Sequence, residues 1–309
     1  MKNYLLTFTM FLLHIGWLGF TASAHPGSGI AVDKYGNIYF IHSGVGVARI
    51  STDGKLNYIH NASDGHWLCL DREGIFSQRQ PMYFERISPN GLKPAIIYAG
   101  GGSPIVMNLD GNFYYCGSQN GDMHPGAMTL IRETPGKKQT IFAPNLENTL
   151  KELGDGITGL AAGPDGSLYA ACWNSLLKIT MQGVVTTLAH PVIVKDCDED
   201  PADHKKANRG IPLLRGIDVD SNGIIYAAAT SCHCLIKLTS DGKIKTILKA
   251  ERPWSPTGVA LWNGNIYVLE YTNANGPSKE GWLPRVRKIA KDGTITVIAD
   301  LSSKNKQRN

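Results

Sequence analysis

The sequence predicts an all-β fold, a six-bladed β-propeller built of four-stranded antiparallel blades. Six repeats each contain short β-rich runs that are separated by two glycine turns. The segment 215–248 shows the pattern most clearly, because Asn222-Gly223 and Asp241-Gly242 stand between such runs and are strong hairpin signals. The first-turn glycines are Gly36, Gly74, Gly111, Gly166, Gly223 and Gly264, and the second-turn glycines are Gly54, Gly91, Gly136, Gly183, Gly242 and Gly293. One such unit cannot bury both faces of its sheet, so we expect the repeats to stack radially.

Two further landmarks recur in register with the turns. A tyrosine stands three residues after the first-turn glycine at Tyr39, Tyr114, Tyr169, Tyr226 and Tyr267, and Ser77 replaces it in the second repeat. A basic-aliphatic pair precedes the second turn at Arg49-Ile50, Arg86-Ile87, Lys178-Ile179, Lys237-Leu238 and Lys288-Ile289, and is inverted at Ile131-Arg132. A β-sandwich is the alternative, but it gives no reason for landmarks in every unit. We expect second strands near residues 37–41, 112–116, 167–171, 224–228 and 265–269, and ring closure by side-chain packing instead of a shared strand.

The first 24 residues are predicted to be a signal peptide. Lys2 precedes an apolar run over residues 4–20, and Ala22-Ser23-Ala24 is the small-x-small pattern of a cleavage site. A membrane anchor is the alternative, but the run is shorter than the roughly 20 residues that a spanning helix needs. We therefore expect a secreted or periplasmic protein without stable membrane insertion, with a propeller over residues 25–301 and a basic tail over residues 302–309.

The charge balance does not indicate a nucleic-acid partner. The chain has 31 basic and 26 acidic residues, and its charges are scattered except in the tail, residues 304–308. Nucleic-acid binding needs a basic face, and scattered charges do not indicate one, so we expect no nucleic-acid partner.

Export makes disulfides possible for the six cysteines Cys69, Cys116, Cys172, Cys197, Cys232 and Cys234. The blade pattern places Cys197, Cys232 and Cys234 in loops at one face, so we favour a bridge from Cys197 to one of the other two. Cys232-His233-Cys234 also suggests a metal site, but structural zinc is coordinated by four ligands, and its motifs usually space cysteines by two or more residues. We therefore weight a metal below a disulfide or a plain thiol.

Four insertions are predicted to decorate one face of the propeller. They cover residues 117–128, 143–156, 190–215 and 271–284, and residues 145–153 have helical spacing of apolar side chains. All four insertions can lie on the face opposite to the short turns. Insertions on one face commonly build a binding surface, so the site is expected on this loop-rich face.

Two rings of residues are predicted at the mouth of the channel on that face. The first contains Ser28, His66, Ser103, Thr158, Arg215 and Thr257, and the second contains His42, Gln80, Gly117, Cys172, Ala229 and Glu270. Trp173, Asn174 and Tyr271 stand next to the second ring. The predicted ligand contacts are Arg215, Glu270, Thr158, Trp173, Asn174 and Tyr271.

Arg215, Asp218 and Glu270 are the charged residues of the rings and inner strands taken together. Asp218 occupies a position where the other repeats carry Ala31, Cys69, Val106 and Ala161. It is either a structural acceptor for backbone N–H groups or a catalytic acid. Arg215 is either part of an ion-pair cluster with the two carboxylates or the anion anchor of a ligand site.

The runs GIAVDKYGNIYF, GLAAGPDGSLYAA, GIDVDSNGIIYAA and TGVALWNGNIYVLE resemble NHL repeats and the gluconolactonase/senescence-marker-protein propellers. This resemblance implies a lactonase with one divalent cation, calcium or zinc, held by Glu, Asn and Asp. The chain departs from that ligand set, with Ser28 at the Glu position, Thr158 or Ser103 at the Asn position, and Cys172 and Ala229 at second-strand ends. Streptogramin lyase propellers are also similar, and that resemblance implies magnesium and acid–base groups, for which His42, His66 and Glu270 are the candidates.

The predicted function is binding of a small organic ligand, glycan or peptide at the loop-rich face. A lactone or ester hydrolase with a divergent metal site is one alternative, with Glu270, His42, His66 and Asp218 as candidate catalytic residues. A protein-interaction propeller is the other alternative. The missing ligands of the metal site favour binding over hydrolysis.

Overall fold

The computed structural model describes residues 26–61, 65–71, 84–87, 95–100, 103–117, 128–136, 138–154, 156–195, 197, 212–273 and 282–302. The predicted signal peptide, nearly all of the basic tail, Gln80 and parts of all four insertions lie outside the described residues. In the described parts of the chain, no helix is long and apolar enough to cross a membrane.

The chain folds into an all-β propeller with five four-stranded antiparallel blades. The first blade contains β1 (Ile30–Val32), β2 (Ile38–His42), β3 (Gly46–Ile50) and β4 (Leu56–Asn61). The third contains β8 (Ile105–Met107), β9 (Phe113–Cys116), β10 (Leu130–Glu133) and β11 (Gln139–Phe142). The fourth contains β12 (Ile157–Ala162), β13 (Leu168–Cys172), β14 (Ser175–Ile179) and β15 (Val185–Ala189). The fifth contains β16 (Leu214–Val219), β17 (Ile225–Ala229), β18 (Cys234–Leu238) and β19 (Ile244–Lys249). The last contains β20 (Ser255–Trp262), β21 (Asn265–Asn273), β22 (Trp282–Ile289) and β23 (Ile295–Asp300).

The second repeat departs from the prediction of six four-stranded blades. Its described residues form a three-stranded sheet in the order β5-β7-β6, with β5 (Gly65–Asp71), β6 (Phe84–Ile87) and β7 (Ala95–Gly100). The expected second strand, after Gly74, lies outside the described residues. This repeat has Ser77 in place of the tyrosine and also carries Pro81, which cannot donate a hydrogen bond within a sheet.

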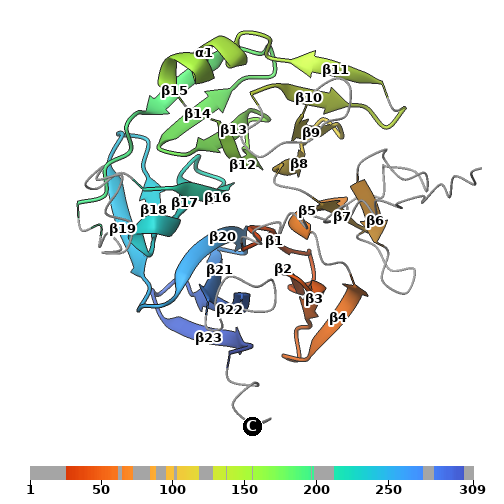
Figure 1. The fold of residues 1–309 in the computed structure, drawn as a ribbon, viewed down its shortest axis with the longest axis vertical. Helices are drawn as coiled ribbons and strands as arrows, with labels where there is room; N and C mark the ends of the chain where they lie inside the picture. The colour runs from red at the N-terminus through yellow and green to blue at the C-terminus, as the bar shows by residue number, and fades with distance from the viewer. Residues whose placement is uncertain are drawn as a thin grey trace, which may run out of the picture.

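The sheets are arranged as a ring, with β1, β5, β8, β12, β16 and β20 nearest the centre (Figure 1). Six clusters of buried hydrophobic residues lie between neighbouring sheets around this ring. For example, one cluster joins Tyr114 of the third blade to Leu168 of the fourth, and another joins Ile30 of the first blade to Leu269 of the last. Each sheet therefore buries both of its faces by stacking.

The tyrosine and the basic residue that recur in the sequence form a cross-strand pair in the blades. Tyr226 of β17 lies directly opposite Lys237 of β18, and the equivalent pairs are Tyr39 with Arg49, Tyr114 with Arg132, Tyr169 with Lys178, and Tyr267 with Lys288. In the first blade the Tyr39 hydroxyl also donates to Asp33 of the first turn, at 3.0 Å. Cross-strand pairs of this kind stabilise sheets, and here they tie the turn to the strands. The glycines of the template turns, Gly223 and Gly242, both have a φ of 77°, as the hairpin signals predicted.

The ring closes without a shared strand, as predicted, because the first sheet is entirely N-terminal and the last is entirely C-terminal. Thr257 of β20 donates to the Gly27 carbonyl oxygen at 2.7 Å. Tyr271 of β21 donates to the Ile41 carbonyl oxygen, and the Ser43 backbone N–H donates to the Tyr271 hydroxyl at 3.2 Å. The predicted second strands are confirmed to within one residue at their first residues, and the predicted helix is α1 (Leu146–Leu153).

Candidate functional site

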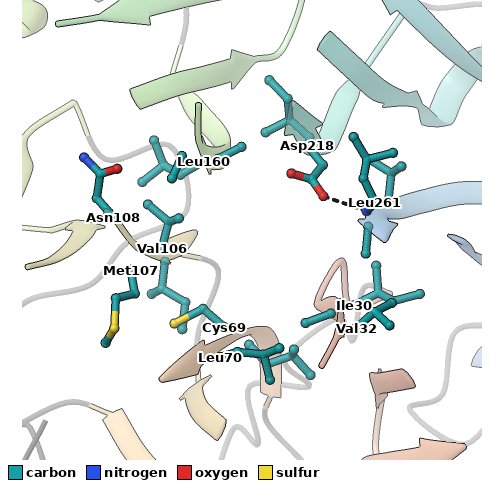
Figure 2. Close-up of a pocket in the computed structure, with 18 of the residues that line it drawn as sticks. Ile30, Val32, Cys69, Leu70, Val106, Met107, Asn108, Leu160, Asp218 and Leu261 are labelled. Atoms are coloured by element: carbon teal, nitrogen blue, oxygen red, sulfur yellow. Dashed lines mark hydrogen bonds between the residues drawn. The ribbon is translucent and has the colours of Figure 1, made fainter. Parts of the chain in front are cut away.

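A cavity of about 440 Å³ lies on the axis of the propeller. All six described sheets contribute inner-strand side chains to its wall, among them Ile30, Leu70, Val106, Leu160, Asp218 and Leu261 (Figure 2). The lining also includes Asn108, Leu109 and Gly111 from the first turn of the third blade. The cavity therefore extends along the channel to the face of the short turns.

The position of this cavity differs from the predicted one. None of the six residues of the first mouth ring lines it. The inner-strand side chains that line it are apolar except for Asp218. Apolar side chains at these positions are compatible with a filled core and with a cavity wall. The sequence therefore held no signal that distinguished the two.

Asp218 is the formally charged residue of the cavity wall. Its Oδ1 accepts the Val219 backbone N–H at 2.8 Å, and its Oδ2 accepts the Leu261 backbone N–H at 2.7 Å, the bond drawn in Figure 2. The free edge of an inner strand presents backbone groups without a ladder partner. Asp218 thus satisfies donors of two neighbouring inner strands, in agreement with the structural interpretation of this residue.

Two other polar groups of the wall are also engaged. Asn108 donates through Nδ2 to the Gly166 carbonyl oxygen at 2.7 Å, which links the third blade to the fourth. Burial raises the pKa of the Cys69 thiol far above its usual range, with a smaller contribution from the charge of Asp71. Cys69 is therefore a neutral, poorly nucleophilic side chain at neutral pH.

Residues of the first mouth ring hold neighbouring blades together. The Thr158 hydroxyl donates to the Leu214 carbonyl oxygen at 2.8 Å, between the fourth and fifth blades. The His66 carbonyl oxygen accepts the backbone N–H groups of Ser28 and Gly29, both at 2.8 Å. Thr158, a predicted ligand contact, thus has its hydroxyl in a seam between blades.

Arg215 is placed differently from the other mouth residues. Its Nη1 donates to the Pro26 carbonyl oxygen at 2.8 Å, and its side chain is partly buried. Burial lowers the pKa of its guanidinium to about 10. The hydrogen bonds of the structure do not support the ion-pair alternative for Arg215, because Arg285 and Arg287 bind Glu270 and backbone N–H groups bind Asp218.

Glu270 is fully buried in an ion network of the last blade. Arg285 donates through Nε to Glu270 Oε2 at 2.7 Å, and Arg287 donates to the other oxygen. Burial raises the pKa of Glu270, and the charges and hydrogen bonds of the two arginines offset this only in part. The Arg285 guanidinium also lies over the Trp254 ring, 4.1 Å from its centroid. Glu270 and Arg285 are direct cross-strand neighbours, so the alternation Arg285-x-Arg287 was the signal that the sequence analysis missed.

The remaining predicted site residues lie apart from the cavity. Tyr271 is buried in the closure between the last and first blades, and its pKa is raised by that burial. Trp173 is 55% exposed, and the Asn174 side chain accepts a hydrogen bond from Ser175 at 3.2 Å. His42 Nδ1 is 2.5 Å from the Tyr58 hydroxyl, and burial lowers the His42 pKa to about 4.

The structure pairs Cys197 with Cys232, and Cys234 is buried and is not part of a disulfide. His233 Nδ1 lies 2.8 Å from the Trp254 carbonyl oxygen and 2.9 Å from the Ser255 hydroxyl. Within the described residues, no group of three or more His, Cys, Asp and Glu side chains could hold a metal ion. The described residues therefore do not fit the calcium, zinc or magnesium site that the family resemblances imply.

Comparisons with known proteins relate the chain to others by fold. No family model matches the sequence, and no curated protein matches it. Among solved structures, a streptogramin B lyase has a TM-score of 0.50 at 16% identity, over 90% of this chain and 84% of that one. A Bacteroides thetaiotaomicron protein of unknown function has a TM-score of 0.55 at 16% identity, over 87% and 70%. A PQQ-bound aldose sugar dehydrogenase from Streptomyces coelicolor has a TM-score of 0.51 at 12% identity, over 82% and 91%. At these identities the likeness shows the propeller fold alone.

Proposed function

We propose that this chain is a ligand-binding propeller that holds a small organic molecule in its axial cavity. The observation that carries this proposal is the cavity itself, about 440 Å³ in volume and walled by inner-strand side chains from all six described sheets. Ligand sites are typically apolar hollows of a few hundred Å³ with a small number of polar groups that orient the ligand. This cavity has both properties.

The lining favours a ligand that has both apolar surface and N–H or O–H donors, because apolar side chains and polar atoms share the wall. Ile30, Leu70 and Leu160 supply apolar contact area, and Asp218 supplies a carboxylate. A carboxylate has about four lone-pair positions and accepts hydrogen bonds from N–H and O–H groups.

Binding is favoured over the hydrolase alternative. Of the four candidate catalytic residues, Asp218 lines the cavity, whereas His66 does not. Glu270 is held by Arg285 and Arg287, and His42 lies against Tyr58. Acid–base catalysis needs its groups within hydrogen-bonding reach of one substrate. The interactions of these side chains support a structural role for Glu270 and His42.

We also propose that the ring has six blades and that its repeats are related to the NHL and gluconolactonase propellers. Six hydrophobic clusters between neighbouring sheets support the blade count, since each interface between blades would need one cluster. The three-stranded sheet β5-β7-β6 would be the second blade.

A cavity-filling variant tests the proposed function. Ala31 lines the cavity and is partly exposed within it. We expect Ala31→Phe to abolish binding of the fragments that a ligand-observed NMR screen finds for the wild-type protein. Thr187→Phe, on the exposed side of β15, is the matched control and should bind the same fragments. Retained binding by Ala31→Phe, or a wild-type protein that binds no fragment, would contradict the proposal.

We propose further that the protein is exported, as its N-terminal pattern predicts. The disulfide between Cys197 and Cys232 supports this, because stable disulfides form mainly in oxidising compartments. Mass spectrometry of the protein purified from its native host tests it. We expect a chain that begins near His25 and carries one disulfide, and an intact N-terminus with all thiols reduced would contradict export.

A further inference from the structure

Arg215 extends across the loop-rich mouth of the channel. It precedes Gly216, and a Cβ at Gly216 would lie 2.5 Å from the Gly258 Cα of the last blade, so the fifth and last blades are in close contact here. The Arg215 side chain passes this contact and reaches the Pro26 carbonyl oxygen, which precedes the first blade. The guanidinium therefore lies at the junction of three blades, and Arg215 is not part of the cavity wall.

The surroundings of Arg215 leave its charge without a counter-ion among the described residues. Glu270 is bound to Arg285 and Arg287, and Asp218 accepts two backbone N–H bonds. The Pro26 carbonyl oxygen is a neutral acceptor. Removing a cation from water costs free energy unless an anion or several acceptors replace the water, and the lowered pKa of Arg215 is consistent with that cost.

The guanidinium also retains donors that a ligand could use. Arginine has five N–H donors, and the bond to Pro26 engages one of them. The residue as a whole is only partly buried, so donors that the Pro26 bond does not engage remain for a ligand. A planar fork with free donors suits a carboxylate, which it binds through two parallel N–H···O bonds.

We propose that Arg215 forms a binding site for the carboxylate group of a small organic acid at the loop-rich mouth. This site is separate from the axial cavity, so it does not depend on the proposed function. A free carboxylate would supply the counter-ion that the described residues do not provide. The propeller would then bind ligands at both ends of its channel.

An anion titration tests this inference. The wild-type protein is titrated with acetate and with succinate at constant ionic strength, and binding is followed by NMR line broadening of each anion and by the shift in melting temperature. We expect binding in the millimolar range, and an apparent Kd at least tenfold weaker for Arg215→Met, which keeps the apolar stem of the side chain. Arg215→Lys, with the charge but without the fork, should fall between the two.

Two controls separate this site from other causes. Arg49→Met removes a partly buried arginine that is bonded to Asn37 at 2.8 Å, and it should bind both anions as the wild-type protein does. Ala31→Phe fills the cavity and should also leave anion binding unchanged. The inference is overturned if Arg215→Met binds as tightly as the wild-type protein, if the wild-type protein binds neither anion, or if Ala31→Phe abolishes binding. Tighter binding of inorganic phosphate than of either carboxylate would overturn the assignment to an organic acid.

Discussion

At the scale of single residues, the charged side chains that stood out in the sequence have separate partners. Asp218, Arg215 and Glu270 were predicted to lie close together, yet each is held by different groups. Arg285 lies directly opposite Glu270 on the neighbouring strand, and Arg287, two residues further along, points to the same side of the sheet. Asp218 meets the inner strand of the next blade, while Glu270 meets the arginines of its own blade.

Glu270 gives the first prediction. Arg285 and Arg287 are 4% and 7% exposed, so Glu270→Ala would leave two buried cations with one carboxylate fewer. We expect the free energy of unfolding to fall by about 3–5 kcal/mol, as for other broken buried ion pairs. Urea denaturation measures this loss. Asp241→Ala, which breaks an exposed pair with Lys243, is the control and should change stability little. A small loss for Glu270→Ala would show that the network is not a structural element.

His42 gives a prediction about pH. Burial lowers its pKa to about 4 in the folded protein, whereas the ordinary value is 6.5. The unfolded chain therefore takes up a proton at higher pH, so the contribution of His42 to stability is present above pH 6.5 and is lost as the pH falls towards 4. We expect the wild-type protein to lose on the order of 3 kcal/mol more than His42→Gln over this interval. Parallel stability curves for the two proteins would contradict the burial of a neutral imidazole.

At the scale of elements, the turns, the second strands and helix α1 could be predicted because local residues determine them. The turns at Asn222-Gly223 and Asp241-Gly242 need a positive φ, which glycine adopts without strain, and both glycines have it. The tyrosine and basic landmarks could be found but not explained, since their pairing across two strands appears only in the register. The second repeat could not be predicted to differ, although it lacks the tyrosine at Ser77.

The close contact between inner strands gives a prediction at this scale. A Cβ at Gly258 would lie 2.3 Å from the Ser28 carbonyl oxygen of the neighbouring blade. We expect Gly258→Ala to lower the free energy of unfolding by about 1–3 kcal/mol or more, because backbone must shift to relieve the overlap. Gly136→Ala is the control, because Gly136 is exposed and its nearest neighbour to a Cβ is a side-chain oxygen at 3.7 Å. Equal stability of the two variants would mean that the blades are less tightly packed than the structure shows.

At the scale of the whole molecule, the stacking of repeats was predictable, but the location of the binding site was not. Loop length directed attention to the loop-rich face, and Arg215 does lie there. The volume of the axial cavity depends on the sizes of side chains from six inner strands, which are spread along the chain from residue 30 to residue 261. No local sequence pattern indicates how much space these side chains leave together. The same limit applies to the sequence resemblance, which concerned repeats and not the space between them.

Ring closure gives the last prediction. The chain runs continuously through every junction between blades except the one between the last blade and the first, where noncovalent contacts alone hold the ring. Tyr271→Phe removes the hydroxyl that bonds the Ile41 carbonyl oxygen at this junction and should cost about 1–3 kcal/mol. Because no covalent link holds the first blade against the last, we expect hydrogen exchange to accelerate mainly in β1–β4.

Thr158→Val is the matched control for this prediction. It removes the hydroxyl that bonds the Leu214 carbonyl oxygen between the fourth and fifth blades, which the chain connects directly. Its loss of stability should be similar, but it should leave exchange in β1–β4 unchanged relative to the other blades. A uniform increase in exchange around the ring for Tyr271→Phe would mean that the propeller opens as one unit, and that its closure is no weaker than its other junctions.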